Sequence, residues 1–476
     1  MESAASAIAQ LGALAASPQV SRLADAFERA GRELALVGGS VRDAFLGAPL
    51  NDLDFTTDAD PDAILAIVAP IADAHWDVGR AFGTIGATIA GHTVEITTYR
   101  TDAYDGATRK PVVEFGDTLE GDLIRRDFTV NAMALRLPQL VLVDPAGGIE
   151  DLLARRLMTP GTPETSFGDD PLRMMRAARF TAQLGFEVAP EVAASMRDLA
   201  ERISIVSAER VRDELSRLLR TDRPRAGLEL LVDTGLATLV LPELPALRLQ
   251  VDEHHHHKDV YEHSLTVLEQ AIDLERARRT TQDAAPDLTL RLAALLHDVG
   301  KPATKRIEPG GAVTFHHHDV VGAKLAAKRL RELRFDKETI GDVARLIELH
   351  LRFFGYTEGA WTDSAVRRYV RDAGPLLERL HILTRADVTT RNRRKADRLA
   401  FAYDDLEDRI AALGEQEELA AIRPDLDGEQ IMATLGIDPG RDVGEAYRFL
   451  LELRLSEGPL GEEEATKRLR AWWSSR

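Results

Sequence analysis

A double glycine followed by an arginine is the first part of the chain that suggests chemistry. The apolar run 34–37 leads into Gly38 and Gly39, and a short helical pattern containing Arg42 follows. Glycine lets the backbone come close to a phosphate, and the N-terminus of a helix attracts negative charge. Arginine can add a bidentate phosphate contact. We therefore expect a strand, a glycine turn and a helix that together bind a phosphate group.

Two aspartates lie shortly after this turn. Asp52 and Asp54 occupy alternate positions of an expected strand, so both side chains point to the same face. Two such like charges are costly without a cation between them. A pair of Mg²⁺ ions about 3.5–4 Å apart would satisfy them and stabilise the attacking and leaving oxygens of a phosphoryl transfer. We expect Asp52 and Asp54 to be catalytic Mg²⁺ ligands; a solvated strand edge is the alternative for an isolated Asp-x-Asp.

Five motifs, in order along roughly the first half of the chain, resemble those of the class II CCA-adding enzymes and bacterial poly(A) polymerases, which belong to the DNA polymerase β superfamily. The glycine turn and the aspartate pair form the first. The others are Arg125–Ala132, Asp144–Leu152, Asp169–Arg176 and Glu209–Leu215. The resemblance implies template-independent transfer of nucleotides from CTP and ATP to the 3′ end of tRNA.

The resemblance also implies a set of nucleotide-binding residues. Within it, Arg126 contacts the triphosphate and Asp127 helps to read the ribose 2′-hydroxyl. The full set is Gly38, Gly39, Arg42, Arg125, Arg126, Asp127, Asn131, Asp170, Arg173, Arg176 and Arg179. Glu95 is a possible third acidic group near the metals, although a structural salt bridge is at least as good an interpretation. The stretch 99–121 resembles the flexible loop of the family.

Asp170 and Arg173 suggest how a protein selects a base without a template. They are three residues apart on an expected helix that starts with Pro171, so they share a face. A carboxylate accepts hydrogen bonds and a guanidinium donates them. Cytosine and adenine present an amino donor beside a ring-nitrogen acceptor, whereas uracil and guanine present the reverse, so one Asp/Arg pair favours C and A. In the family, a pair equivalent to Arg210 and Glu214 supports the neck helices.

The second half of the chain carries a series of histidines and aspartates that resembles the HD phosphohydrolase superfamily. The adjacent pair His297-Asp298 is its centre. Imidazole and carboxylate groups can hold one or two divalent metals with a bound water as nucleophile. The expected ligands are His263, His297, Asp298, His318, His350 and Asp387. Some HD domains hydrolyse phosphoesters, including 2′,3′-cyclic phosphates, and the substrate here stays open.

The chain has 476 residues, no cysteine and a formal net charge of -18, which excludes disulfides and thiolate metal sites. Arginine is frequent in 125–225 and 367–398, so basic patches for tRNA remain possible on an acidic protein. The basic run from Arg391 to Arg398 either holds tRNA phosphates or is a solvated helix face. We expect no membrane span and a cytoplasmic location.

These patterns predict an α+β fold, with a small polymerase-β-like nucleotidyltransferase α/β head followed by a mostly helical neck, HD domain and tail. We expect strands at 34–37 and 53–56 and a hairpin at 84–99. From residue 170 onward the pattern is helical, with helices expected at 171–183, 209–220 and 324–333. The expected parts are an N-terminal helix (1–30), the head (31–160), the neck (161–245), the HD domain (246–400) and the tail (401–476). Two other functions stay open: a poly(A) polymerase with the same head, and a phosphohydrolase whose head is vestigial and only binds RNA. An enzyme that adds only CC or only A is a further possibility.

Overall fold

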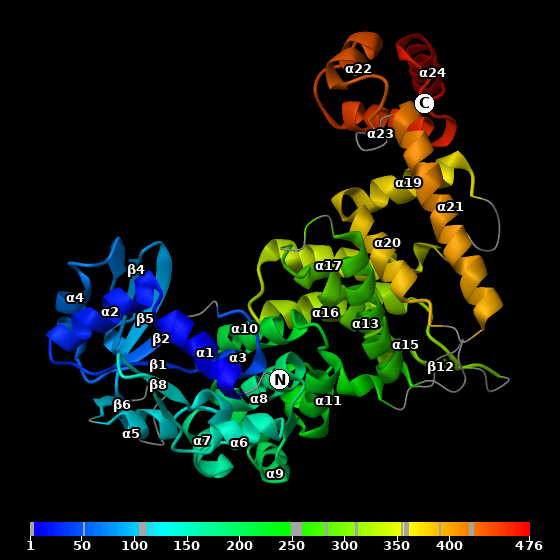
Figure 1. The fold of residues 1–476 in the computed structure, drawn as a ribbon. Helices are drawn as coiled ribbons and strands as arrows, with labels where there is room; N and C mark the ends of the chain where they lie inside the picture. Colours follow the sequence, from blue (N-terminus) through cyan, green and yellow to red (C-terminus); the bar gives the residue numbers. More distant parts are fainter. Residues whose placement is uncertain are drawn as a thin grey trace. The chain divides into compact units, whose positions relative to one another are not determined.

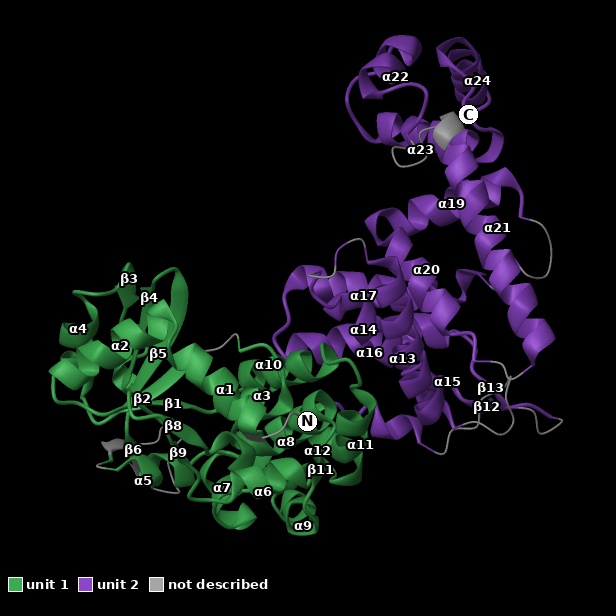
Figure 2. Cartoon of the chain, viewed as in Figure 1, with its two compact units in different colours: residues 1–240 green, residues 241–476 purple. Residues whose placement is uncertain are grey.

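The computed structural model is a mixed α+β structure that divides into two compact units, residues 1–240 and 241–476 (Figures 1 and 2). The structure describes residues 4–50, 53–103, 112–116, 118–248, 259–279, 281, 284–309, 313–353, 356, 361–389, 392–417 and 423–476. Asp52 and Arg391 lie outside these residues, as do Asn51 and the whole histidine run 254–257. The predicted α+β class is confirmed.

A seven-stranded sheet forms the core of the first unit. Its strand order is β3-β4-β5-β2-β1-β8-β9, and β2 and β5 are its parallel pair. The strands are β1 (Leu34–Val37), β2 (Asp54–Thr57), β3 (Ala74–Trp76), β4 (Thr84–Ile89), β5 (His92–Thr98), β8 (Ala134–Leu137) and β9 (Val141–Val143). The predicted strand at 34–37 and the predicted hairpin at 84–99 are confirmed, with the turn at Gly91 in the left-handed region.

Helices pack on this sheet around β1, which is apolar on both faces. All four residues of β1 are buried. Ala35 and Val37 pack with Leu119 and Leu123 of α5 (Leu119–Ile124) in one hydrophobic cluster. α2 (Pro18–Arg29) and α4 (Pro61–Val68) also pack against the sheet and each other. The expected single N-terminal helix is two helices, because Pro18 begins α2 after α1 (Ala4–Ala15).

The predicted loop at 99–121 contains regular structure at both ends. β6 (Arg100–Ala103) and β7 (Val112–Phe115) pair in antiparallel register, and α5 follows. Residues 104–111 lie outside the described part of the chain. The resemblance of this stretch to the flexible loop of the family stays an expectation.

The rest of the first unit is helical, as predicted from residue 170 onward. The expected helices at 171–183 and 209–220 are α8 and α10. The elements are α3 (Gly39–Leu46), η1 (Arg80–Phe82), η2 (Thr129–Asn131), α6 (Gly148–Leu153), β10 (Arg156–Leu157), α7 (Pro163–Asp169), α8 (Leu172–Leu184), β11 (Glu187–Val188), α9 (Pro190–Asp198), η3 (Ala200–Ile205), α10 (Ala208–Leu219), α11 (Arg225–Asp233) and α12 (Leu236–Val240).

The second unit is almost entirely helical. It contains η4 (Pro245–Leu247), α13 (Val260–Arg278), α14 (Leu288–Leu296), α15 (Lys301–Thr304), β12 (Arg306–Ile307), β13 (Val313–Thr314), α16 (His318–Glu332), α17 (Lys337–Leu349), η5 (His350–Phe353), α19 (Asp363–Ala373), η6 (Gly374–Leu376), α20 (Leu377–Ala386), α21 (Arg393–Glu417), α22 (Gly428–Leu435), α23 (Arg441–Glu457) and α24 (Glu462–Ser474). The helix expected at 324–333 begins earlier, at His318. α22, α23 and α24 share a small apolar cluster of their own, which includes Ile431, Leu450 and Leu469.

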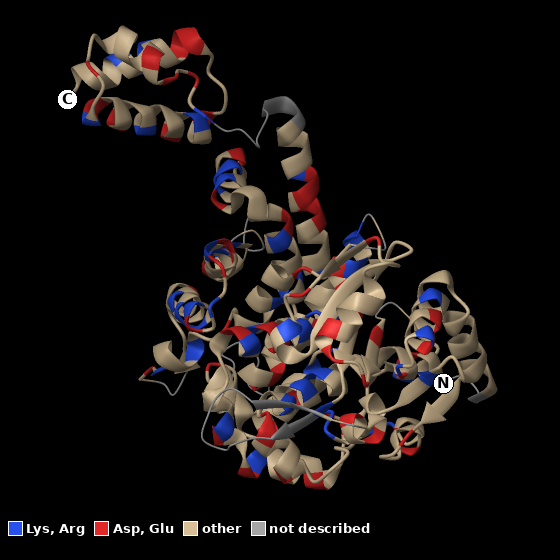
Figure 3. Ribbon diagram, turned by 90° about the vertical axis from the view of Figure 1, so that its left-hand side faces the viewer, with Lys and Arg blue, Asp and Glu red and all other residues tan. Residues whose placement is uncertain are grey.

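Among the described residues, no helix is both long and apolar enough to cross a bilayer. Basic and acidic side chains are interspersed over the described ribbon (Figure 3). The cytoplasmic location stays a prediction.

Candidate active site

The double-glycine turn is built as the sequence suggested. Gly38 has φ +72° and lies directly before α3, and Gly47 ends that helix in the left-handed conformation. A Cβ added at Gly38 would lie 3.3 Å from Nη1 of Arg126, so a side chain there would meet both strain and a cation. The turn and the second motif therefore meet in space: the Arg126 guanidinium lies against the Gly38 backbone.

A buried aspartate holds the arginines of the second motif. Asp122, in α5, accepts hydrogen bonds from Nη2 of Arg125 at 2.9 Å and from Nη2 of Arg126 at 3.2 Å. Burial alone would raise the pKa of Asp122, but the charges of Arg126 and Arg125 outweigh it and lower that pKa. The Nε of Arg126 is buried and has no hydrogen-bond partner among the described residues. Arg126 thus keeps a donor that a phosphate oxygen could satisfy.

Asp54, at the start of β2, and Glu95, in the middle of β5, are neighbours in the sheet. β2 and β5 run parallel, and Asp54 is the register partner of Glu95, so both side chains project from the same face of the sheet. Both residues are exposed. Two carboxylates on one accessible face match the oxygen ligands that Mg²⁺ prefers. Asp52 lies outside the described residues, and its role as a metal ligand stays a prediction.

Arg42 takes a different position from the one expected of a phosphate ligand. It is 5% exposed, its Nη1 donates to Oδ1 of Asn131 at 2.7 Å, and its Nε donates to Oδ1 of Asp43 at 2.8 Å. The guanidinium therefore links α3 to the second motif. Its direct contact with phosphate stays a prediction, and in this structure it positions Asn131.

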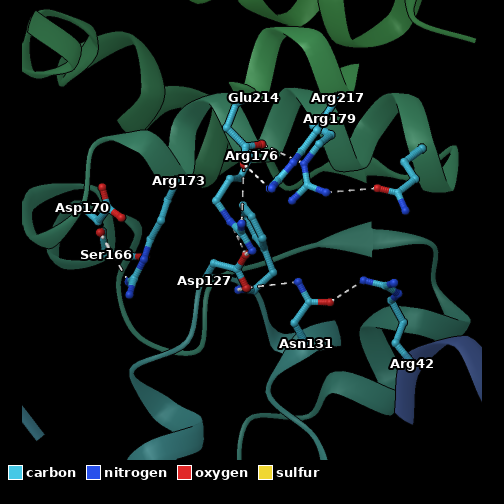
Figure 4. Close-up of polar contacts among 12 residues, drawn as sticks. Arg42, Asp127, Asn131, Ser166, Asp170, Arg173, Arg176, Arg179, Glu214 and Arg217 are labelled. Atoms are coloured by element: carbon cyan, nitrogen blue, oxygen red, sulfur yellow. Dashed lines mark hydrogen bonds and ion pairs between the residues drawn. The ribbon is translucent and has the colours of Figure 1, made fainter. Parts of the chain in front are cut away.

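Asn131 continues a polar chain that runs into the neck helices (Figure 4). Its Nδ2 donates to Asp127 at 3.0 Å, and Asp127 also accepts from Nε of Arg176 on α8 at 2.8 Å. Burial would raise the pKa of Asp127, but Arg176 and Asn131 lower it to about 2. Asp127 therefore stays a carboxylate, which is the form that can accept a bond from a ribose hydroxyl.

Glu214 of α10 closes this chain from the other side. It is 3% exposed and lies 2.8 Å from Nε of Arg179, 3.2 Å from Nη1 of Arg217 and 3.7 Å from Nη1 of Arg176. Arg210, four residues earlier, instead bonds to Asp170 at 2.9 Å. The two members of the expected Arg210/Glu214 pair thus support the neck through different partners.

The expected base-selecting residues lie at the junction of α7 and α8. Asp170 ends α7 and accepts from the backbone N–H of Leu172, while Arg173 is in the first turn of α8. Arg173 donates to Oγ of Ser166 at 2.9 Å and to the carbonyl of Arg125 at 2.6 Å. Asp170 and Arg173 are both half-buried. The second and fourth motifs therefore meet at Arg173, and base selection stays a prediction.

In the second unit, the six expected metal ligands come together. One cluster is His263, His297 and Asp387, and the other is Asp298, His318 and His350; within each, the candidate ligand atoms lie within 4.8 Å of one another. The Nε2 atoms of His263 and His297 are 3.3 Å apart, and His263 Nε2 lies 2.9 Å from Asp387. Imidazole and carboxylate groups at such spacing fit one or two divalent metals.

The outer nitrogens of the four imidazoles fix their orientation. Nδ1 of His297, His318 and His350 each lies within 2.9 Å of a backbone carbonyl, and Nδ1 of His263 lies 3.1 Å from Oγ1 of Thr389. Each Nε2 is thereby directed into the cluster, which is the arrangement that orients histidine ligands of metals. In addition, Nε2 of His318 is buried and lies 3.3 Å from Oδ1 of Asp298, while Oδ2 of Asp298 lies 3.2 Å from Nε2 of His297.

Close packing of the α16 backbone against Gly300 supports the HD cluster. A Cβ on Gly300 would lie 2.1 Å from the carbonyl of His318 and 2.6 Å from the amide of Gly322. Only glycine lets α16 approach the His297-Asp298 segment this closely. Lys301 adds a cation 2.9 Å from Oδ2 of Asp298. Burial lowers the pKa of His350 to about 4, and the charge of His297 adds to this, so the His350 imidazole is neutral and able to bind a metal.

Three family models match the chain: a poly A polymerase head domain over residues 34–158, a probable RNA and SrmB-binding site of polymerase A over residues 185–247, and an HD domain over residues 260–392. An A-adding tRNA nucleotidyltransferase from Deinococcus radiodurans is 36% identical over 92% of this chain and 94% of its own length. The chain belongs to the tRNA nucleotidyltransferase and poly(A) polymerase family.

Other members of the family are similar over all or part of the chain. A CC-adding tRNA nucleotidyltransferase from Thermus thermophilus is 32% identical over 92% of this chain and 93% of its own. A CCA-adding enzyme from Bacillus pumilus is 38% identical, but over only 46% of this chain and 54% of its own. The crystal structure of the Bacillus stearothermophilus CCA-adding enzyme in complex with CTP has the same fold, with a TM-score of 0.66 at 24% identity, over 96% of this chain and 98% of that one.

Sequence reasoning missed two supports of the head of this family member. Asp122 is an acid three and four residues before Arg125 and Arg126, which is the spacing of a helical ion pair and was a readable signal. Phe180 packs edge-on against Phe128 and lies beneath the guanidinium groups of Arg42, Arg176 and Arg179, whose carbon atoms are 4.2–5.5 Å from the ring centre. A single buried phenylalanine on an amphipathic helix gives no such signal in the sequence.

Proposed function

We propose that this chain adds cytidine and adenosine nucleotides to the 3′ end of tRNA, using CTP and ATP and completing CCA. The observation that carries the proposal is that the first, second and fourth motifs meet in space. The Gly38 turn of the first motif lies against Arg126 of the second, and the carbonyl of Arg125, next to Arg126, accepts a hydrogen bond from Arg173 of the fourth. Family membership and the fold of the CTP-bound structure support it.

In this proposal the chain's own residues bind and orient the two substrates. The Gly38 and Gly39 backbone and Arg126 receive the triphosphate, because the turn lies at a helix N-terminus and Arg126 has an unused buried donor. Asp52 and Asp54, with Glu95 beside Asp54, would hold Mg²⁺. Bound there, the metal ions would favour ionisation of the tRNA 3′-hydroxyl and neutralise charge on the leaving pyrophosphate.

Base choice is assigned to Asp170 and Arg173, with Arg176 and Arg179 supporting them from the next turns of α8. Arg125, Asp127 and Asn131 hold these base-selecting side chains in position, and Asp127 accepts a hydrogen bond from the ribose hydroxyl. The anchoring of Arg173 on Ser166 and on the Arg125 carbonyl supports the proposal, because a fixed guanidinium discriminates better than a mobile one.

A tRNA that ends before CCA, incubated with CTP, with ATP or with both, tests the activity directly. Sequencing the products should show CC with CTP alone and CCA with both nucleotides. Runs of A without C would favour a poly(A) polymerase instead. No extension of this tRNA, nor of one that already ends in CC, would favour the vestigial head.

A partial enzyme is the second candidate, because the two relatives that match nearly the whole chain are an A-adding and a CC-adding enzyme. A tRNA that already ends in CC separates the possibilities. An A-adding enzyme would extend only this substrate, a CC-adding enzyme would leave it unchanged, and a full CCA-adding enzyme would extend both this substrate and the shorter one.

For the second unit, we propose that the HD cluster binds one or two divalent metals and hydrolyses a phosphoester. The buried, pre-oriented ligands His263, His297, Asp298, His318, His350 and Asp387 support this. Assays of the purified protein with nucleoside 2′,3′-cyclic phosphates, with and without added Mn²⁺ or Ni²⁺, test it. Release of a monophosphate only when metal is present is the expected result.

A further inference from the structure

The first turns of α21 carry a group of cations that the proposed reactions do not use. Arg393, Arg394, Lys395 and Arg398 are all exposed, and the structure gives none of them an acidic partner among the residues it describes. Asp397 is the one acid among residues 393–400. Positive charge at a helix N-terminus opposes the helix dipole, so this placement does not serve the stability of the helix.

An exposed aromatic ring lies on the same helix face. Phe401 is 72% exposed, and it follows Arg394 and Arg398 by seven and three residues, which places the three side chains along one stripe. Tyr403 is about 200° further around the helix, where it is buried and donates to the carbonyl of Thr384. The stripe with Phe401 therefore faces away from the packed side of α21.

The opposite side of α21 lines a cavity and forms ion pairs with neighbouring helices. Ala396, Ala400 and Tyr403 of α21 line a cavity of about 370 Å³ with Gln270 and Val388. The acids in the middle of α21 are used by neighbours, since Glu407 bonds to Arg278 and Arg385, and Asp404 to Arg385. The four exposed cations of the first turns thus outnumber the one acid beside them, Asp397, which lies on the same side of the helix as Phe401. The next acid on that side, Asp405, accepts from the hydroxyl of Tyr356.

We propose that Arg393, Arg394, Lys395, Arg398 and Phe401, the α21 strip, bind single-stranded RNA. Cations paired with an aromatic face bind such RNA by contacting phosphates and stacking a base. An acidic protein segment would use the cations but would not explain an exposed ring beside them. The inference does not depend on nucleotide transfer in the head, because its tests measure only RNA binding.

The location of the strip relates it to the HD cluster of the same unit. Arg393 follows Asp387 by six positions, so their Cα atoms are at most about 22 Å apart. Arg393 to Phe401 spans about 12 Å of helix. RNA held along the strip therefore has its end within reach of the metal cluster, which is the position required of a phosphoester substrate.

The first test is the salt dependence of binding of a short, mixed-sequence, single-stranded RNA to the full chain. The variant with Arg394→Gln, Lys395→Gln and Arg398→Gln should lower the slope of log K against log salt by about 2, since each lost phosphate contact contributes about 0.7. A control with Lys324→Gln, Lys328→Gln and Arg331→Gln on α16 makes the same change in net charge. Equal slopes for the strip variant and this control would overturn the proposal.

The second test measures the contribution of the Phe401 ring to RNA binding. Phe401→Ala should weaken binding of the same RNA about tenfold, the effect expected for loss of one stacked base. A photoreactive benzophenone amino acid at position 401 should cross-link to the RNA, and the same amino acid at Ile307, which is 74% exposed in the same unit, should not. Equal cross-linking at both positions, or displacement of the RNA by polyglutamate as readily as by unlabelled RNA, would overturn the assignment to RNA.

Discussion

The head and the HD cluster hold their acidic groups in opposite ways. Asp54 and Glu95 lie exposed and side by side on two parallel strands. In the HD cluster, His297, Asp298 and His350 are each 1% exposed, and every imidazole is fixed through its second nitrogen. The head therefore leaves its carboxylates accessible, whereas the HD cluster has its ligands oriented before any metal binds.

The difference follows from what must enter each site. The head has to admit a triphosphate and an RNA end, so its charges face an open surface and its buried network holds the arginines behind them. In the HD cluster, burial lowers the pKa of His297, but Asp298 and Asp387 outweigh it and raise that pKa to about 10. Imidazole and carboxylate groups thus neutralise one another in the buried cluster, and a metal would take the place of the shared protons.

Replacement of the exposed acid in the head should give the largest effect. Asp54→Ala should lower nucleotide addition at least about a thousandfold, because a metal ion contributes several kcal/mol of charge stabilisation. Incorporation of labelled CMP into tRNA measures it, and tRNA binding should persist. Asp62→Asn, an exposed acid on α4, is the matched control. Robust incorporation by the Asp54 variant would contradict the role of this strand.

Loss of an HD ligand should affect the other site alone. His297→Ala should weaken metal binding by the purified protein at least about 100-fold, since even outer partners of a metal ligand are worth 10- to 100-fold. Metal content by mass spectrometry and tRNA extension are measured together. His316→Ala removes an exposed histidine two residues from His318 and should leave the metal in place. A parallel loss of tRNA extension in the His297 variant would contradict the claim that the two sites act independently.

The network behind the head site should contribute to stability. Glu214→Gln should lower the free energy of unfolding by about 3 kcal/mol, because Arg179 loses its buried carboxylate partner while Arg176 keeps Asp127. Urea denaturation measures it. Glu209→Gln on the exposed side of the same helix is the control and should change stability little. Equal effects of the two substitutions would show that the buried pairs carry no net stabilisation.

Asp127 should give the smallest of these effects and a defined pH window. Its pKa is lowered from 3.8 to about 2 on folding. A lowered carboxyl pKa stabilises the folded state above the unfolded-state pKa, and the gain is lost as pH falls through the folded-state value. Asp127 should therefore contribute about 2 kcal/mol above pH ~5 that disappears between pH ~4 and pH ~2.

Asp127→Asn tests this window. The difference in the free energy of unfolding between this variant and the unmodified chain should narrow as the pH is lowered from neutrality toward pH ~2. A difference that is constant with pH would mean that the Asp127 charge is not the source of the stabilisation.

The sequence by itself determined which residue types meet at each site. The glycine turn, the β1 strand and the β4–β5 hairpin follow from local apolar patterns and turn residues, and their predicted positions match the structure. The six HD ligands were expected from the resemblance to the HD phosphohydrolase superfamily, and in the structure they come together in two groups. These predictions succeeded because strand alternation, helix periodicity and glycine turns are local properties of the chain.

Only the tertiary structure decided how the charges pair. Arg42 binds Asn131 across 89 positions of sequence, and Arg173 reaches the Arg125 carbonyl across 48. A residue type predicts that a guanidinium needs a partner, but the partner is chosen by which helix packs on which strand. The same applies to Glu95, which becomes the neighbour of Asp54 only because β2 and β5 pair in parallel register.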